Sequence, residues 1–343
     1  MKQRSISTVT LIKQTFSKND LSESGFNAYV SETRKRIDLE LSEFVKGISD
    51  LTLQPQLEYA ILSEGKRLRP LLIVLSAESV GGNRNEIIHL ALAFELMHTA
   101  TLVHDDIIDQ DEMRRGRLAV HRKWSVSDAI LTGDALIALA VNLASEYGET
   151  VLKTMTRSAL QLCDGAHKDV TLPLRKVTEK SYFKKIEEKS ASLFKASAFC
   201  GALAGGGTPM EIDSLSTFAE NLGIAYQLKD DIIDFSQEEK IVSKDLKGGV
   251  VNLPLIHTYA LSSLSEKQEI EKDLQAILNK SLEEGYENVK NVVDLVIQTG
   301  SFRYCEQKIE EYLQRAVSSL SPLKDTKYKG YLVDMTRILK TLK

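Results

Sequence analysis

The chain has 343 residues, of which 43% are hydrophobic and 27% charged, and its formal net charge is −4. This length suits one large domain or about two smaller ones, and the apolar share is enough for a substantial core. The charge balance, with no long basic run, argues against a nucleic-acid partner. The three cysteines, Cys163, Cys200 and Cys305, follow no metal-ligand spacing, so we expect reduced thiols.

The N-terminal residues carry no clear targeting signal. Residues 1–19 lack the continuous hydrophobic region of a signal peptide, and no stretch has the ~20 uninterrupted apolar residues of a membrane span. We therefore predict a cytoplasmic protein with no transmembrane segment. We divide the chain into a loosely attached N-terminal arm, residues 1–25, and one domain, residues 26–343.

Helical periodicity recurs along the chain, with Gly and Pro at the expected helix ends. Six prolines are few for this length, as expected for a helical protein. The predicted helices include residues 26–45, 71–80, 84–110, 128–145, 149–169, 178–204 and 210–234. Another predicted helix has Pro55 in its first turn and extends to residue 62, and a further one begins at residue 253 or 254. Residues 266–343 predict further amphipathic, peripheral helices, and no alternating run predicts a strand. The expected fold class is all-α, a single-domain helical bundle.

Two predicted helices end in the same acidic sequence: residues 105–109 and residues 230–234 both read DDIID. Residues four apart share a helix face, so Asp105 projects with Asp109, and Asp230 with Asp234. These carboxylates repel one another unless a cation offsets them, and Mg²⁺ prefers oxygen ligands and usually binds with phosphates. One such cluster is more often a solvated helix end. Two clusters in matching apolar contexts favour a diphosphate held between two helices through metal.

Cations lie close to the acidic clusters in the sequence. A short loop, residues 65–70, reads GKRLRP, and Arg114 and Arg115 follow the first cluster. Such side chains bind phosphate readily, although an ordinary basic loop, or arginines that simply pair with the cluster, would give the same pattern. His98 lies two turns before Asp105 and could share its cavity, although a histidine there is more often a satisfied core residue.

These motifs, in this order, resemble those of the trans-polyprenyl diphosphate synthases over about residues 30–300. The two DDIID sequences, the first with its paired arginines and the second with Gln227, resemble the two aspartate-rich motifs of that family, and residues 65–70 resemble its basic loop. Supporting matches are Gly133-Asp134, Lys189-Ser190, Asp245-Leu246 and Leu253-Pro254-Leu255. The resemblance implies the isoprenoid synthase fold, a helical bundle around a deep central cavity, usually as a homodimer.

The resemblance also implies a reaction, in which a prenyltransferase condenses isopentenyl diphosphate with an allylic diphosphate, head to tail. Mg²⁺ ions that bridge the allylic diphosphate would be bound by Asp105, Asp109 and Asp230, with Asp106, Asp231 and Asp234 in support. The same substrate would contact Arg114, Lys189, Ser190, Gln227 and Lys240. Isopentenyl diphosphate would be held by Lys66, Arg69, His98 and Arg115.

Four positions stand out against the family pattern. Ser190 occupies a place where threonine is common and keeps the hydroxyl. Val250 and Asn252 stand where lysine and threonine are usual, and the missing lysine removes one contact to the allylic diphosphate. Lys229, directly before Asp230, is a cation without an assigned role, either a salt-bridge partner or a solvent-facing side chain.

Side chains one turn before the first aspartate limit product length in this family. Here they are Thr101 and Ala100, both small, with Met97 one turn deeper. An isoprene unit is comparable to the ~5.4 Å pitch of a helix, so small residues there predict a long-chain product of the quinone side-chain type. The alternatives are a short-chain farnesyl or geranylgeranyl diphosphate synthase and a non-catalytic subunit of a heteromeric synthase. A terpene cyclase would share the fold but needs no basic loop for a second diphosphate.

Overall fold

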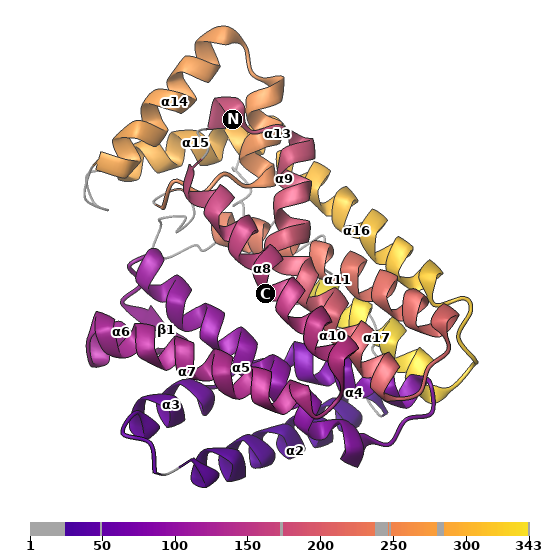
Figure 1. The fold of residues 1–343 in the computed structure, drawn as a ribbon. Coiled ribbons are helices and arrows are strands. Elements are labelled where there is room, and N and C mark those ends of the chain that lie inside the picture. Colours follow the sequence, from indigo (N-terminus) through magenta and orange to yellow (C-terminus); the bar gives the residue numbers. More distant parts are fainter. Residues whose placement is uncertain are drawn as a thin grey trace.

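Helices form nearly all of the secondary structure in the described residues, as the hydrophobic periodicity predicts (Figure 1). The computed structural model describes residues 25–48, 50–171, 174–236, 246, 248–279 and 285–341. Most of the predicted N-terminal arm, Lys240 and Asp245 therefore lie outside the described residues.

The first half of the chain contains α2 (Phe26–Gly47), α3 (Gln54–Ile61), α4 (Leu68–Ser79), α5 (Arg84–Ile108), β1 (Met113–Arg114), β2 (Arg117–Leu118), α6 (Val120–Lys123), α7 (Val126–Ser145) and α8 (Glu149–Thr171). The second half contains η1 (Leu174–Lys176), α9 (Glu179–Ile186), η2 (Glu187–Ala191), α10 (Ser192–Ala204), α11 (Pro209–Ser236), α13 (Leu253–Leu261), α14 (Leu264–Asn279), α15 (Tyr286–Gln298), α16 (Ser301–Ser319) and α17 (Lys327–Thr341).

Most helix ends agree with their sequence signals. Pro55 lies in the first turn of α3, and Asn83 caps α5 by accepting a hydrogen bond from the Asn85 backbone N–H at 3.1 Å. Two details differ from the prediction. Residues 178–204 contain a π-helical turn, η2, between α9 and α10, and β1 pairs with β2 in an antiparallel hairpin. A strand of two residues is too short to show the alternation that predicts strands.

The helices α4 and α10 lie at the centre of the fold and contribute to both hydrophobic clusters of the core. One cluster joins them to α2, α3, α5, α7 and α8, and the other joins them mainly to α11 and α13–α17. Because α4 packs on α5 and on α10, and α10 packs on α11, the two helices that carry the acidic clusters are held in a fixed relation.

The C-terminal helices are not all peripheral, so the prediction for residues 266–343 is only partly right. In Figure 1, α14 and α15 project at the end of the molecule opposite α2 and α3. In contrast, α16 packs along α11 and buries Cys305, Ile309 and Leu313 on that side. A high share of charged residues on the outer face of α16 hides this apolar stripe in a simple reading of composition.

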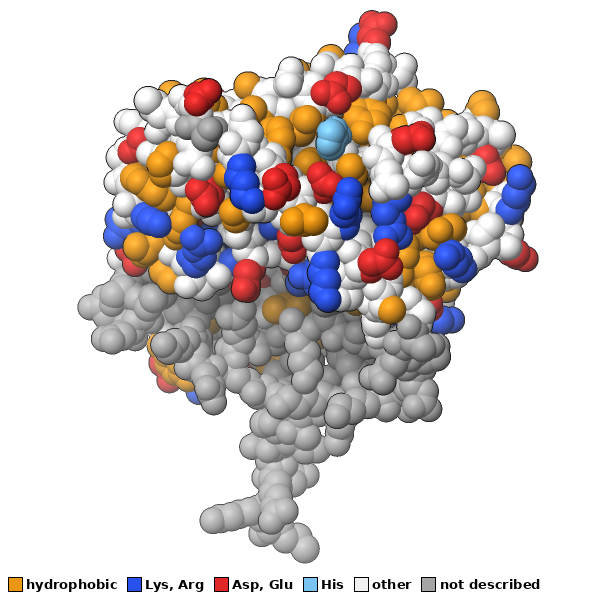
Figure 2. All heavy atoms as spheres, turned by 90° about the horizontal axis from the view of Figure 1, so that it is seen from below, with side chains coloured by type: hydrophobic (Ala, Val, Ile, Leu, Met, Phe, Trp, Pro, Cys, Tyr) orange, Lys and Arg blue, Asp and Glu red, His pale blue; other side chains and the backbone are white. Residues whose placement is uncertain are grey.

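Charge and thiol chemistry on the described surface follow the composition. On the face drawn in Figure 2, Lys and Arg side chains are interspersed with Asp and Glu rather than gathered in one basic region. All three cysteines are free thiols, as predicted; Cys163 is exposed, and Cys200 and Cys305 are buried.

Two described helices, α5 and α7, are long and apolar enough to pass a simple test for a membrane span, which the sequence prediction did not anticipate. In α5, 72% of the apolar window is buried inside the protein, so this helix is explained as the core of a globular fold. Only 33% of the window in α7 is buried, which leaves an apolar face of this helix exposed.

Candidate active site

The first acidic cluster lies at the C-terminal end of α5. Asp105 is partly buried, and Asp109 is the exposed residue that ends the helix, its backbone N–H donating to the Asp105 carbonyl at 2.8 Å. The pKa of Asp105 is raised to about 6, chiefly by burial; Lys189 opposes the rise and Asp109 adds to it. A carboxylate is also disfavoured at this end of a helix by the macrodipole. The protein therefore keeps Asp105 where its charge is costly unless a cation binds.

Asp106, the next residue along α5, forms an ion pair with Arg114. The Nε of Arg114 donates to Oδ1 of Asp106 at 2.6 Å, and its Nη2 contacts both Asp106 and, at 3.1 Å, Oδ2 of Asp111. Only 3% of Asp106 is exposed, so the carboxylate is committed to the pair. Arg114 thus fixes the end of α5 to the β1–β2 hairpin, and its predicted contact with the allylic substrate stays a prediction.

The second acidic cluster lies near the C-terminal end of α11. The pKa of Asp230 is raised to about 7, chiefly by burial; the neighbouring Asp231 adds to the rise, and Lys66 and Arg69 oppose it. Asp234, four residues on, is partly buried. Asp230 therefore resembles Asp105, since both are carboxylates that the fold holds in a costly, poorly solvated place.

Asp231 has a bracing role in this structure. It is 3% exposed and accepts hydrogen bonds from the Tyr182 hydroxyl at 2.5 Å, the Gln227 side-chain amide at 3.0 Å and the Leu253 backbone N–H at 3.2 Å. These bonds connect α9, α11 and the start of α13. We interpret Asp231 as a structural support for Asp230, and its predicted part in binding Mg²⁺ stays a prediction.

Lys189 and Ser190 lie in the π-helical turn η2, where the helix is locally wider. The Ser190 hydroxyl donates to Oε1 of Gln227 at 2.6 Å, which orients the amide that bonds Asp231. The turn is pressed against α8, because a Cβ at Gly165 would lie 2.6 Å from the Lys189 backbone nitrogen. Glycine at this position permits the close approach of the two backbones.

The basic loop brings Arg69 together with His98 and Arg115. Burial lowers the pKa of His98 well below its usual range, and Arg69 and Arg115 lower it further. The Nε of Arg69 and the Nδ1 of His98 are buried with no hydrogen-bond partner among the described residues. Because unpaired buried donors are costly, this cluster is suited to an anion that supplies the missing acceptors.

Two aromatic rings line the same region. The Arg69 guanidinium lies 4.7 Å from the ring centroid of Phe194. The ring centroids of Phe194 and Tyr226 are 5.7 Å apart. The Lys66 amine lies 3.5 Å from the Tyr226 hydroxyl. The rings therefore support the cations by stacking and shield them from solvent on one side.

The acidic side chains fit a hard divalent cation that is shared with a ligand. Among the described residues, no three His, Cys, Asp or Glu side chains converge closely enough to form a metal site by themselves. Mg²⁺ commonly keeps several waters and uses one or two carboxylates together with substrate phosphates. Asp105 and Asp230 supply such oxygen donors without a closed protein cage.

A model of a known family matches most of the chain: residues 51–296 match the family described as polyprenyl synthetase. The chain belongs to the polyprenyl synthetase family. This confirms the resemblance, and with the helical structure it confirms the predicted fold class.

Individual members of the polyprenyl synthetase family align over most of their length. The geranylgeranyl diphosphate synthase of Sulfolobus acidocaldarius is 34% identical over 312 residues, which cover 87% of this chain and 92% of that protein. The octaprenyl diphosphate synthase of Escherichia coli is 32% identical over 305 residues, 84% of this chain and 90% of that protein. A polyprenyl synthase from Caulobacter crescentus, crystallised with calcium and isoprenyl diphosphate, superposes with a TM-score of 0.83 at 26% identity, covering 93% of this chain and 98% of that one. The protein is thus a prenyl diphosphate synthase, and its relatives make products of different length.

Placed in the structure of this polyprenyl synthetase, Lys229 and Asn252 acquire explanations that the sequence left open. Lys229 is 5% exposed, so it does not face solvent; burial lowers its pKa, and Glu306 is the carboxylate that opposes this. Asn252 caps α13 by accepting a hydrogen bond from the Leu255 backbone N–H at 3.4 Å. An amide oxygen therefore takes the capping role that suits threonine as well.

The sequence prediction missed four residues of this region: Arg67, Glu95, Tyr182 and Tyr226. Arg67 was present in the basic loop, but its partners Asp38 and Glu95 are distant in the sequence. Tyr226 lies four residues before Asp230, at a spacing that places both on one face of α11 and could have identified it. Tyr182 and Glu95 carry no local signal of their contacts.

Proposed function

We propose that the protein condenses isopentenyl diphosphate with an allylic diphosphate, head to tail, in the presence of Mg²⁺. The observation that carries this proposal is the presence of two different anion-binding arrangements. One consists of carboxylates with raised pKa values, Asp105 and Asp230, which would bind a diphosphate through a metal ion. The other consists of the buried side-chain nitrogens of Arg69 and His98 that have no hydrogen-bond partner among the described residues.

Two arrangements are what the reaction needs, because one substrate loses its diphosphate and the other keeps it. Mg²⁺, when bound, neutralises the charge that builds on the leaving diphosphate. Asp105, Asp109 and Asp230 would hold it, and Lys189 adds a cation near Asp105. The Caulobacter polyprenyl synthase was crystallised with calcium, another hard divalent cation, which supports this choice.

Lys66, Arg69, His98 and Arg115 would hold the diphosphate that is kept. Plain cations suffice there because no bond to that diphosphate breaks. The allylic substrate ionises, the double bond of isopentenyl diphosphate attacks the allylic cation, and a proton is then lost. With no dedicated base evident, the departing diphosphate is the proposed acceptor. The rings of Phe194 and Tyr226 help to exclude water from the cation.

We propose a long-chain product, on the basis of the side chains on α5. Ala100 is fully buried, Met97 is 3% exposed, and the Thr101 hydroxyl is occupied by the His98 carbonyl at 2.8 Å. The first Phe, Tyr or Trp on the Asp105 face is Phe94, about two turns deeper than Thr101. No Phe, Tyr or Trp side chain therefore stands on this face in the first two turns before the acidic cluster. Relatives include geranylgeranyl, geranylfarnesyl and octaprenyl diphosphate synthases, so the family alone leaves the length open.

Incubation of the purified chain with Mg²⁺, farnesyl diphosphate and isopentenyl diphosphate, followed by mass analysis of the product, tests both parts. Linear products longer than geranylgeranyl support the proposal, and C15 to C20 products alone contradict the long-chain part. No product would favour a non-catalytic subunit, and a cyclic hydrocarbon would favour a terpene cyclase. Ala100→Phe should shorten the product; an unchanged product would place the hydrocarbon elsewhere.

We also propose a homodimer formed through α7. Its exposed face carries Val126, Ile130, Leu131 and Ile137, with exposed fractions of 50%, 45%, 52% and 36%. Large apolar side chains exposed together on one helix often mark an interaction site, and a second copy of the chain is the occupant that isologous symmetry favours.

A further inference from the structure

Arg67 is the most constrained residue of the basic loop. Its side chain is 5% exposed, although it lies between Lys66 and Arg69, which are predicted to bind substrate. Its backbone has φ of 50° and ψ of 38°, the left-handed region that non-glycine residues rarely adopt. The surrounding contacts must therefore hold it in this strained conformation.

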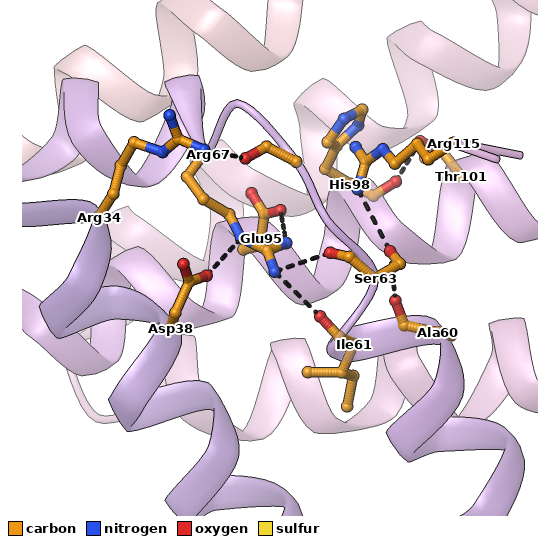
Figure 3. Close-up of polar contacts among 11 residues, drawn as sticks. Arg34, Asp38, Ala60, Ile61, Ser63, Arg67, Glu95, His98, Thr101 and Arg115 are labelled. Carbon is orange, nitrogen blue, oxygen red and sulfur yellow. Dashed lines mark hydrogen bonds and ion pairs between the residues drawn. The ribbon is translucent and has the colours of Figure 1, made fainter. Parts of the chain in front are cut away.

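The Arg67 guanidinium forms four contacts with three elements (Figure 3). Its Nη1 donates to Oε1 of Glu95 on α5 at 2.6 Å, and its Nε donates to Oδ1 of Asp38 on α2 at 2.9 Å. Its Nη2 donates to the carbonyls of Ile61 at 3.2 Å and Ser63 at 2.9 Å, where α3 ends. One side chain thus fixes both ends of the loop between α3 and α4 to α5.

The same loop holds Arg115. The Ser63 hydroxyl accepts a hydrogen bond from Nη1 of Arg115 at 3.3 Å and donates to the Ala60 carbonyl at 2.9 Å. Arg34 donates to the Gly65 carbonyl at 2.9 Å from the other side. Figure 3 shows His98 and Arg115 beside this loop. Any displacement of residues 63–67 would therefore move the cations of the site.

Glu95 also acts on the other cations. It is 2% exposed, and its carboxylate is the charge that most strongly opposes the effect of burial on the pKa values of both Arg69 and Arg115. On α5, Glu95, His98 and Asp105 are spaced by three and seven residues, so they follow one face of the helix. The helix α5 thus carries Glu95, which supports the basic loop, together with the His98 imidazole and the first acidic cluster.

We propose that Glu95 and Arg67 are a positioning pair for the site of isopentenyl diphosphate. The pair holds the left-handed turn that presents Lys66 and Arg69, and through Ser63 it places Arg115. The inference rests on the proposed function for the identity of the ligand, but its geometry stands on the pair itself. Neither residue touches the substrate.

The alternative is a pair that serves only the stability of the fold. Buried ion pairs are often replaced by apolar side chains of similar size without loss of stability, whereas removal of one partner leaves an uncompensated charge. The double variant R67M/E95M therefore separates the two roles, because it keeps the burial and removes the polar contacts. Glu95→Gln keeps the shape and removes the charge.

The matched control is Glu78→Gln. Glu78 is a partly buried carboxylate that contacts Arg84 at 3.2 Å and the Tyr29 hydroxyl at 2.5 Å, away from the loop. All variants are compared by the KM for isopentenyl diphosphate, the KM for farnesyl diphosphate, kcat and the midpoint of thermal unfolding. A calorimetric titration with inorganic pyrophosphate in EDTA adds a reading of the basic site, because the carboxylate site binds such an anion poorly without metal.

In R67M/E95M we expect thermal stability near that of the unaltered chain, with a KM for isopentenyl diphosphate raised at least about tenfold. Glu95→Gln should also raise the KM for isopentenyl diphosphate, and both variants should bind pyrophosphate more weakly by a factor similar to the rise in that KM. In both, the KM for farnesyl diphosphate should change less than about twofold. Glu78→Gln should leave both KM values unchanged.

The proposal is overturned if R67M/E95M folds and keeps the KM for isopentenyl diphosphate and the affinity for pyrophosphate. It is also overturned if both KM values rise together in Glu95→Gln and Glu78→Gln, which a general loss of stability would produce. If the unaltered chain has no turnover, the proposed function fails, and the pyrophosphate titration still decides whether the pair positions an anion site.

Discussion

Replacing Asp230 by Asn is expected to stabilise the protein in the absence of metal while abolishing turnover. Burial raises the pKa of Asp230 from an ordinary value of 3.8 to about 7. At about 1.4 kcal/mol for each pH unit between the two values, this corresponds to about 4 kcal/mol. Partial solvation of the side chain and relaxation of the unliganded site reduce the cost, so we expect a gain of about 2 kcal/mol at pH 8.

The gain should depend on pH in a defined direction. A raised pKa means that the folded protein binds the proton more tightly than the unfolded chain, so the unaltered protein loses stability as the pH rises from about 4 through about 7. Asn does not titrate, and Asp230→Asn escapes this loss. Most of its advantage should therefore be present above about pH 7 and absent near pH 4.

Thermal unfolding in EDTA at about pH 8 and pH 4.5 provides the assay, with an expected rise of roughly 3 °C at the higher pH for a chain of this length. Asp213→Asn, an exposed position on the same helix, is the control and should change stability by less than about 0.5 kcal/mol. A lower unfolding temperature for Asp230→Asn at pH 8, or a gain of equal size at both pH values, would refute the reasoning.

Three further outcomes follow from contacts in the site and on α7. Gly65→Ala places a Cβ 2.7 Å from Nη1 of Arg115, so it should displace that flexible side chain and raise the KM for isopentenyl diphosphate about tenfold with little change in stability. Gly330→Ala, with open space around it, should leave that KM unchanged. The pKa of His98 lies well below its usual range, so the free protein holds this side chain neutral. His98→Gln should therefore keep the KM for isopentenyl diphosphate within about threefold and leave the pH profile of activity between about 6 and 8 unchanged. A shifted profile would show that His98 titrates in this range. Ile130→Asp should convert a dimer to a monomer in sedimentation experiments, and an unchanged sedimentation coefficient would place the interface elsewhere.

The sequence predicted the helices well because their signals are local. Pro55, the Asn83 cap and the 3.6-residue period of apolar positions act within one or two turns, and α2, α5, α7 and α11 begin or end within about two residues of the predictions. The two DDIID sequences were equally informative. Like charges four residues apart on a helix repel one another, so their spacing alone indicates that a cation or solvent must offset the repulsion.

The contacts that organise the site could not be predicted in this way. In a run of three cations, nothing local distinguishes Arg67, which is buried against Glu95, from Lys66 and Arg69. Tyr182 reaches Asp231 over 49 residues of sequence, and only the packing of α9 on α11 brings them together. A prediction from spacing alone identifies the groups that carry charge and omits those that hold them in place.

The π-helical turn between Glu187 and Ala191 also determines the rotational register of the helices on its two sides. Each residue of a helix advances the chain by about 100° around the axis, so deleting one residue within this turn would rotate α9 by about that angle relative to α10. Tyr182 would then point away from Asp231, even if every other residue were unchanged. The number of residues in this turn, and not only their identity, is therefore part of what defines the second acidic cluster. Relatives that differ here by an insertion or a deletion would need a different support for the same carboxylate.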